Sequence, residues 1–178
     1  MSGLLFLTSD DFNTQKGTKG NIVCNNIRGF SLILFYSTSC PHCQQFIPLF
    51  KTLPGNLPGC QFGLININKN KRVIRESKQS VSPIEYVPYI ILFINGKPFM
   101  RYDGPPDQHE IINFIQEISK RVEDKQQFSR KVPNKKEAIP DKIVVKSQKN
   151  IPQYSVGVPL YGCDGDVCYF EFQTAYKK

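Results

Sequence analysis

The strongest hydrophobic runs in the chain are short, of strand length, and separated by polar segments. Residues 31–36 (Ser-Leu-Ile-Leu-Phe-Tyr) are almost continuously apolar, which is typical of a strand buried on both faces of a sheet. The pair Asn95-Gly96 follows another such run and is a strong hairpin signal, so a partner strand is expected directly after it. Strands are predicted over residues 4–7, 31–36, 61–68, 89–94 and 97–103.

Segments between these strands show the spacing of helices. Over 107–122 the apolar positions Ile111, Phe114, Ile115 and Ile118 recur at three and four residues, and they predict a helix with one buried face. Helices are predicted over residues 11–28, 44–53, 71–79 and 107–122. The first is weakly patterned and is interrupted by glycines, and the second contains Pro48, which is expected to kink it. The resulting order, β-α-β-α-β-α-β-β-α, predicts an α/β fold: a mixed central sheet with helices on both faces.

Beyond residue 122 the periodic pattern disappears. Residues 123–157 are rich in proline and basic residues and predict a linker or arm, whereas 158–178 become aromatic and β-like again. We therefore expect a domain at 1–122, a basic arm at 123–157 and a hairpin-like tail at 158–178, the last two forming an irregular or β C-terminal extension.

Charge is concentrated in the same region. The chain carries a net charge of +8, and residues 119–150 alone hold ten basic against four acidic residues, or +6. A stable protein partner of this arm is one expectation; nucleic acid ranks last, because few aromatic residues lie among the basic ones. No stretch approaches the ~20 apolar residues of a membrane span. The N-terminus lacks the basic start of a signal peptide, so a cytoplasmic protein is expected.

The candidate chemistry lies in Cys40-Pro41-His42-Cys43, between the buried strand and the second helix. A cysteine reacts as its thiolate, and the unpaired N–H groups and dipole of a helix N-terminus favour that charge. We predict that Cys40 is the exposed nucleophile and Cys43, about one turn later, the buried resolving thiol. Pro41 suits an early helix position, and His42 adds a polar group beside the thiolate. No metal and no cofactor are expected beyond a redox-active disulfide.

This arrangement resembles the thioredoxin family over residues 3–122. The resemblance rests on the order of elements, the CxxC motif after the second strand, the Asn-Gly hairpin, and Pro88 just before the fourth strand. It implies a thioredoxin-like fold in which Pro88 is a cis-proline facing the cysteines. It also implies that the residue before it, Val87, offers backbone hydrogen bonds to substrates. The implied activity is thiol–disulfide exchange on protein thiols and disulfides.

Two positions depart from the family pattern. Ser39 stands where thioredoxins usually have tryptophan, and Leu34 stands where many have a buried carboxylate that accepts the proton of the second cysteine. The Pro-His dipeptide instead resembles bacterial periplasmic disulfide oxidases, which also have valine before the cis-proline. This likeness implies a pair biased toward oxidation, since a stabilised reduced form makes a disulfide more oxidising.

Alternatives remain for the second cysteine pair and for the function. Cys163 and Cys168 flank a predicted hairpin tip and could be a structural clasp, idle thiols, a second redox pair, or zinc ligands together with Cys40 and Cys43. The rival to an oxidoreductase is a structural or interaction protein that uses the domain as a scaffold. Large cytoplasmic DNA viruses encode thioredoxin-like proteins of this kind, which makes a virion or capsid component one possible setting.

Overall fold

A six-stranded mixed sheet forms the centre of the protein. The computed structural model describes residues 3–130 and 157–159, with side chains described up to residue 122. The strands lie in the order β1 (Leu4–Leu7), β5 (Cys60–Asn66), β4 (Phe30–Tyr36), β6 (Tyr89–Ile94), β7 (Lys97–Tyr102) and β8 (Gly157–Pro159). β1, β5 and β4 are parallel to one another, whereas each of the pairs β4–β6, β6–β7 and β7–β8 is antiparallel. The expected mixed sheet is confirmed.

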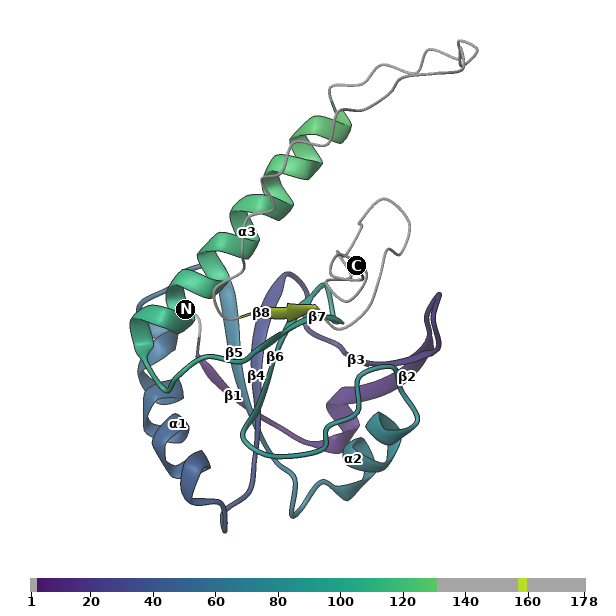
Figure 1. Ribbon diagram of the computed structural model, residues 1–178, viewed down its shortest axis with the longest axis vertical. Coiled ribbons are helices and arrows are strands. Elements are labelled where there is room, and N and C mark those ends of the chain that lie inside the picture. The colour runs from purple at the N-terminus through teal and green to yellow at the C-terminus, as the bar shows by residue number, and fades with distance from the viewer. Residues whose placement is uncertain (1–2, 131–156, 160–178) are drawn as a thin grey trace, which may run out of the picture.

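Both faces of the sheet are covered, because its central strand is apolar on both sides. Leu32 and Leu34 of β4 pack under α1 (Pro41–Thr52) and α3 (Gln108–Arg130). Ile33 and Phe35 point to the opposite face and pack with α2 (Lys71–Lys78) and a small second sheet. All four side chains are fully buried, as the alternation of a strand between two layers requires. Figure 1 shows α1 and α3 on one side of the sheet and α2 on the other.

The prediction of a helix over residues 11–28 is wrong. This segment forms a two-stranded antiparallel sheet of β2 (Phe12–Lys16) and β3 (Asn21–Asn25), preceded by the short 3-10 turn η1 (Ser9–Asp11). The glycines that interrupt the helical pattern form the turn: the N–H of Gly17 donates to the carbonyl of Gly20 at 2.8 Å, and Gly20 has φ +145°. The hairpin packs on the central sheet. Its one buried aromatic ring, Phe12, contacts the rings of Phe35 and Phe93.

The other predicted helices form, with different ends. α1 begins at Pro41 and runs through Pro48 to Thr52, and a 3-10 turn, η2 (Leu53–Gly55), follows it. α3 is longer than expected and continues to Arg130, and its buried face includes Ile111, Phe114 and Ile118. In Figure 1 its second half extends away from the sheet.

The Asn-Gly turn between β6 and β7 has a special backbone. Asn95 and Gly96 both have positive φ, 50° and 81°, as a two-residue hairpin with a primed turn requires. The carbonyl of Gly96 also accepts a hydrogen bond of 2.8 Å from the N–H of Asn25, at the end of β3. A Cβ at Gly96 would collide with the carbonyl oxygen of Asn25, so the two sheets meet closely at this glycine.

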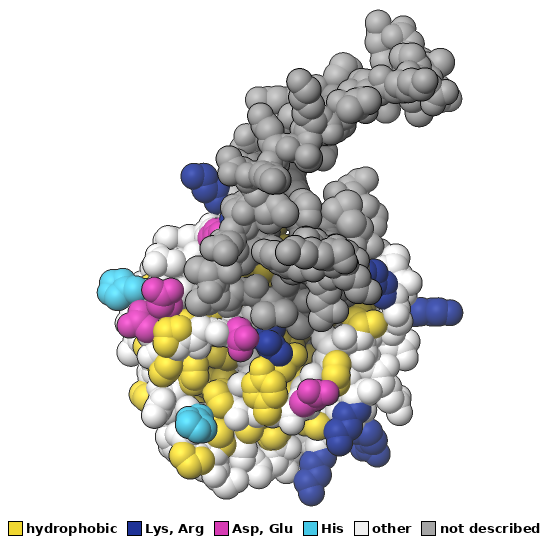
Figure 2. Space-filling view, viewed as in Figure 1, with side chains coloured by type: hydrophobic (Ala, Val, Ile, Leu, Met, Phe, Trp, Pro, Cys, Tyr) yellow, Lys and Arg dark blue, Asp and Glu magenta, His cyan; other side chains and the backbone are white. Residues whose placement is uncertain are grey.

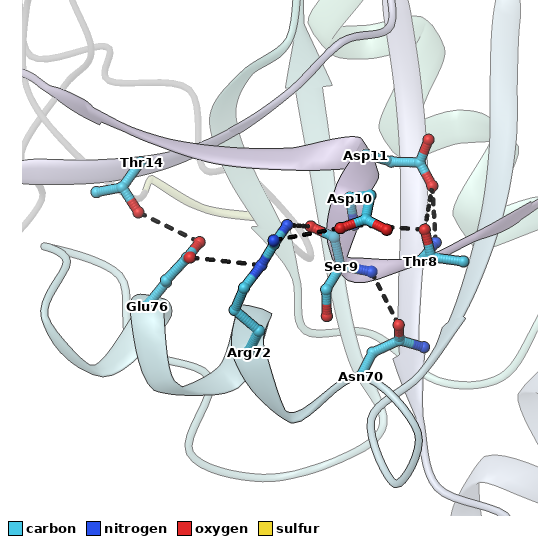
Figure 3. A network of polar contacts seen from close by, with 8 residues as sticks. All are labelled: Thr8, Ser9, Asp10, Asp11, Thr14, Asn70, Arg72 and Glu76. Carbon is cyan, nitrogen blue, oxygen red and sulfur yellow. Dashed lines mark hydrogen bonds and ion pairs between the residues drawn. The ribbon is translucent and has the colours of Figure 1, made fainter.

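A polar network fastens α2 to the N-terminal segment (Figure 3). Arg72 pairs with Asp10 of η1 at 3.2 Å and with Glu76 one turn further along α2 at 3.6 Å. The N–H of Ser9 donates to the Asn70 side chain at 2.8 Å, just before α2 begins. One side of α2 is thereby fixed to η1.

Besides the last residues of α3, β8 is the described part of the C-terminal extension. It pairs with β7, with Gly157 opposite Tyr102 and Pro159 opposite Met100, and so occupies the edge of the sheet. The other expectations for the extension, including the hairpin with Cys163 and Cys168, fall on residues outside those described. None of the helices between residues 3 and 130 combines the length and hydrophobicity that a membrane crossing requires.

Candidate active site

Cys40 lies where β4 passes into α1. β4 ends at Tyr36, and Cys40 is the N-cap of the helix, with extended φ and ψ of −94° and 113°. The intervening turn is closed by the N–H of Cys40, which donates to the Ser37 carbonyl at 3.3 Å, and by a 2.9 Å hydrogen bond between the Ser37 and Ser39 hydroxyls. The buried strand and this turn therefore fix the first cysteine at the start of the helix.

The two cysteines of the motif are close together but differ in exposure. The backbone N–H of Cys43 donates to Cys40 Sγ at 3.2 Å, so Cys40 takes the place of an ordinary capping side chain. Cys40 is partly exposed, whereas Cys43 has no exposed surface. The four cysteines among the described residues are free thiols in this structure.

The environment of Cys43 opposes its ionisation. Burial raises the pKa of the Cys43 thiol well above its usual range, and its hydrogen bond with Cys40 raises it further. The backbone at Ser37 acts in the opposite direction to a smaller extent. No carboxylate of the described residues is among the groups that set this pKa, in keeping with the fully buried Leu34 at the family's carboxylate position. Cys43 is thus held as a neutral thiol.

Val87 and Pro88 lie directly against the first cysteine. The peptide bond between them is cis, and Cys40 Sγ donates to the Val87 carbonyl oxygen at 3.4 Å. The preceding segment is attached to α2 by Ser77, whose buried hydroxyl accepts from the N–H of Ile84 at 3.2 Å. The two predicted site segments, far apart in the sequence, are therefore together, and α2 supports the second.

The middle residues of the motif face solvent. Pro41 and His42 are exposed in the first turn of α1, and the His42 side chain has no hydrogen bond or ion pair with the described residues. Ser39, at the position of the family's tryptophan, is exposed as well.

A hollow beside Val87 is a feature that the sequence did not predict. It has a volume of about 510 Å³ and lies between α2 and residues 83–87, with Ile74, Lys78 and Tyr86 among its lining residues. The Tyr86 side chain is large, hydrophobic and 49% exposed. An aromatic residue next to the predicted substrate-binding valine was the available signal.

The remaining cysteines are placed differently. Cys24 of β3 and Cys60 of β5 are buried, and burial raises their pKa to about 11 and about 12. Among the described residues, no group of three or more His, Cys, Asp or Glu side chains gathers where it could hold a metal ion. Cys163 and Cys168 lie outside the described residues.

Comparison with known proteins agrees with this geometry. The sequence model of the family described as Thioredoxin matches residues 14–117, more than half of the chain. The chain belongs to the thioredoxin family. A thioredoxin from Chlamydia pneumoniae is 28% identical over 87 residues, which are 49% of this chain and 80% of that protein. Dithiol chemistry of the thioredoxin type requires no cofactor.

Two viral relatives match the thioredoxin domain and its extension together. Uncharacterized protein 196R of Invertebrate iridescent virus 6 is 32% identical over 184 residues, covering 99% of this chain and 95% of that protein. Uncharacterized protein 020R of Invertebrate iridescent virus 3 is 29% identical over 98% of this chain and 96% of that protein. These matches fit a protein of a large DNA virus in which the extension accompanies the thioredoxin domain.

Proposed function

We propose that the protein is a thiol–disulfide oxidoreductase that acts on protein thiols through Cys40 and Cys43. The observation that carries the proposal is the placement of a partly exposed Cys40 Sγ at a helix N-terminus, 3.2 Å from the Cys43 N–H and 3.4 Å from the Val87 carbonyl. First-turn N–H groups and the helix dipole favour a thiolate at this position. Cys43 is buried directly behind it.

The proposed reaction has two exchange steps. The Cys40 thiolate attacks one sulfur of a substrate disulfide, that S–S bond breaks, and one substrate thiolate leaves with its electron pair. Cys43 then loses its proton and attacks Cys40 Sγ, which releases the second substrate thiol and closes the Cys40–Cys43 disulfide. Two electrons pass from the protein to the substrate, and substrate oxidation is the same sequence reversed.

The role of Val87 and Pro88 in the proposal is to align the substrate. Because Cys40 Sγ contacts the Val87 carbonyl, a peptide bound along Val87 has its sulfur beside Cys40. Its backbone would pair with the main chain of Val87 in the manner of an added strand. Pro41 and His42, exposed in the first turn, then face the substrate.

The direction of exchange is proposed to favour oxidation of the substrate. In a dithiol protein, a more stable reduced form makes the disulfide the stronger oxidant. The Pro-His dipeptide and Val87 support this direction by their likeness to bacterial disulfide oxidases. A potential well above the ~−270 mV of thioredoxin is expected.

A glutathione titration followed by thiol trapping and mass spectrometry tests the proposal. The expected result is a reversible Cys40–Cys43 disulfide, with Cys43→Ser accumulating a mixed disulfide on Cys40 and the matched Cys40→Ser accumulating none at Cys43. A pair that never changes oxidation state, or that releases zinc on thiol modification, would overturn the assignment. The same measurement shows whether Cys163 and Cys168 change oxidation state with the first pair.

A second candidate function is a scaffold in a larger assembly, such as a virion. Two observations favour it: α3 continues beyond the predicted domain boundary at residue 122 to Arg130, and the two viral relatives match the extension as well as the domain. This function predicts that removing residues 123–178 abolishes a stable complex that Cys40→Ser leaves intact. Under the oxidoreductase proposal, Cys40→Ser abolishes exchange and the truncated chain keeps it.

A further inference from the structure

Helix α2 presents three different faces, and the third combines a partly buried Ile74, which packs against the core, with exposed basic side chains. Val73 and Ser77 are buried against the sheet. Arg72 and Glu76 are used in the network with η1 (Figure 3). The third face carries residues at the i, i+3, i+4, i+7 spacing of one helical stripe. This basic stripe consists of Lys71, Ile74, Arg75 and Lys78.

The basic stripe borders the hollow beside the candidate active site. Ile74 and Lys78 of the stripe line the hollow on one side, and residues 83–87 line it on the other. Its last lining residue is Val87, whose carbonyl oxygen is 3.4 Å from Cys40 Sγ. A substrate side chain in this hollow would therefore belong to a residue close to the reacting cysteine.

Tyr86 lines the hollow, and neighbouring side chains restrain its ring. Its ring contacts the ring of Tyr89 edge to face at 5.3 Å, and the Arg101 guanidinium lies 5.8 Å from its centroid. These contacts hold Tyr86 in place although it is 49% exposed. With Ile74 opposite, the hollow offers apolar surface that an aliphatic side chain would cover.

The charge around the hollow is unbalanced. Among the described residues, no acidic side chain forms an ion pair with Lys71, Arg75 or Lys78, and the carboxylate on the hollow's own lining is Glu85. Figure 2 shows Lys and Arg side chains gathered over α2 beside a largely hydrophobic area. Three cations against one carboxylate favour an acidic partner.

We propose that the hollow and the basic stripe together select substrates whose reacting cysteine is flanked by an aliphatic residue and by acidic residues. The aliphatic side chain enters the hollow between Ile74 and Tyr86, and the acidic side chains lie along Lys71, Arg75 and Lys78. This inference rests on the proposed exchange at Cys40 and adds the class of sequence that Cys40 meets. It assigns binding roles to Tyr86 and to the stripe.

Matched peptides test the selection. Each has one cysteine flanked by leucine and two variable residues, which are aspartate, asparagine or lysine, and each is coupled as a mixed disulfide to 5-thio-2-nitrobenzoate. Attack of Cys40 on the peptide sulfur breaks that S–S bond and releases the coloured thiolate, and Cys43 then displaces the peptide thiol. The second-order rate constant of colour release should be about tenfold higher for the aspartate than for the lysine peptide at low salt, and the difference should shrink at high salt.

Three variants connect that difference to named residues. Lys78→Glu should reduce or reverse the preference for the aspartate peptide, and Glu85→Gln should increase it. Lys51→Glu changes the net charge as much as Lys78→Glu, but on an exposed position in the last turn of α1, and should leave the preference unchanged. Replacing the leucine of the peptide by alanine should slow wild-type exchange severalfold, and Tyr86→Ala should remove that difference.

The outcomes separate this inference from the proposed function. Equal rates for the three peptides, or equal effects of Lys78→Glu and Lys51→Glu, would overturn the selection while leaving exchange at Cys40 intact. Failure of every peptide, and of oxidised glutathione, to react with Cys40 would instead overturn the oxidoreductase proposal itself.

Discussion

Cys43 has no exposed surface, and burial followed by its hydrogen bond with Cys40 raises the pKa of its thiol. Leu34 supplies no carboxylate that could take up its proton. In the proposed mechanism the second step needs the Cys43 thiolate and must wait for the loss of this proton. The mixed disulfide between Cys40 and the substrate is therefore expected to last long enough to be trapped.

The rate of the second step should depend on pH because the pKa of the Cys43 thiol is raised. Below the raised pKa of Cys43, the thiolate fraction increases tenfold for each pH unit, so resolution of a glutathione mixed disulfide should accelerate about tenfold per unit from pH 6 to pH 9. Acid quenching and mass spectrometry at successive times measure the rate. A plateau near pH 7 would show that another group accepts the proton.

The sequence predicts the position of a site residue where that residue belongs to a recognisable motif, and not elsewhere. Cys40-Pro41-His42-Cys43 and Val87-Pro88 can be positioned relative to strands and helices because each is adjacent to a strongly patterned run. The hollow cannot be predicted in this way, because it depends on how α2 meets residues 83–87, a contact fixed by the Ser77 hydroxyl and Ile84. A single serine in a polar helix gives no such signal.

Among the secondary-structure elements, the hairpin of β2 and β3 could not be predicted from hydrophobic periodicity. β2 buries one residue, Phe12, and exposes the other four, so it lacks the alternation of a typical strand. The two glycines interrupt a helical pattern, but glycines flanking Thr18 and Lys19 and followed by Ile22-Val23 also fit a turn and a strand. The strands of the central sheet are predictable because burial on both faces makes them continuously apolar.

The contact between the hairpin and the main sheet depends on Gly96. Gly96→Ala should destabilise the protein by about 2–4 kcal/mol, since the residue has φ 81° and a Cβ would meet the Asn25 carbonyl oxygen. Gly55→Ala is a matched control without a positive φ and with open space around the added methyl, and should change stability by less than about 1 kcal/mol. Urea unfolding gives both values, and equal effects would contradict this account of the turn.

Strand β8 covers the edge of β7, and two truncations isolate its contribution. A chain ending at Val156 should lose about 1–3 kcal/mol of unfolding free energy and self-associate through the exposed β7 edge. A chain ending at Leu160 retains β8 and should remain as stable and as dispersed as one with the full tail. Urea unfolding and size-exclusion chromatography distinguish the two, and identical behaviour would mean that β8 adds nothing to the sheet.

The folded protein should become less stable at alkaline pH. Burial raises the pKa of Cys24 to about 11 and of Cys60 to about 12, against 9.0 for an unburied thiol, and Cys43 is shifted in the same direction. Above pH 9 the unfolded chain releases protons that the folded chain retains. The stability is therefore complete below pH 9 and is lost as pH rises toward 11, by about 1.4 kcal/mol per pH unit for each such thiol.

Cys60→Ala tests this dependence. The variant should be less stable than wild type at pH 7, because it leaves a small cavity, but its stability should fall less steeply between pH 9.5 and 11. Urea titrations across that range under reducing conditions measure the slope. Parallel curves for the two proteins would show that Cys60 does not contribute.

The pairing of β8 with β7 also bears on how such proteins can diversify. The described part of α3 runs to Arg130 and β8 begins at Gly157, so the sequence between them is tethered at both ends. The entropy of closing a loop grows only with the logarithm of its length, by about 0.6 kcal/mol for each doubling. Insertions and deletions between these two anchors therefore cost little stability, and this interval is where a lineage could acquire new segments, or an engineer a cargo domain, without disturbing the dithiol.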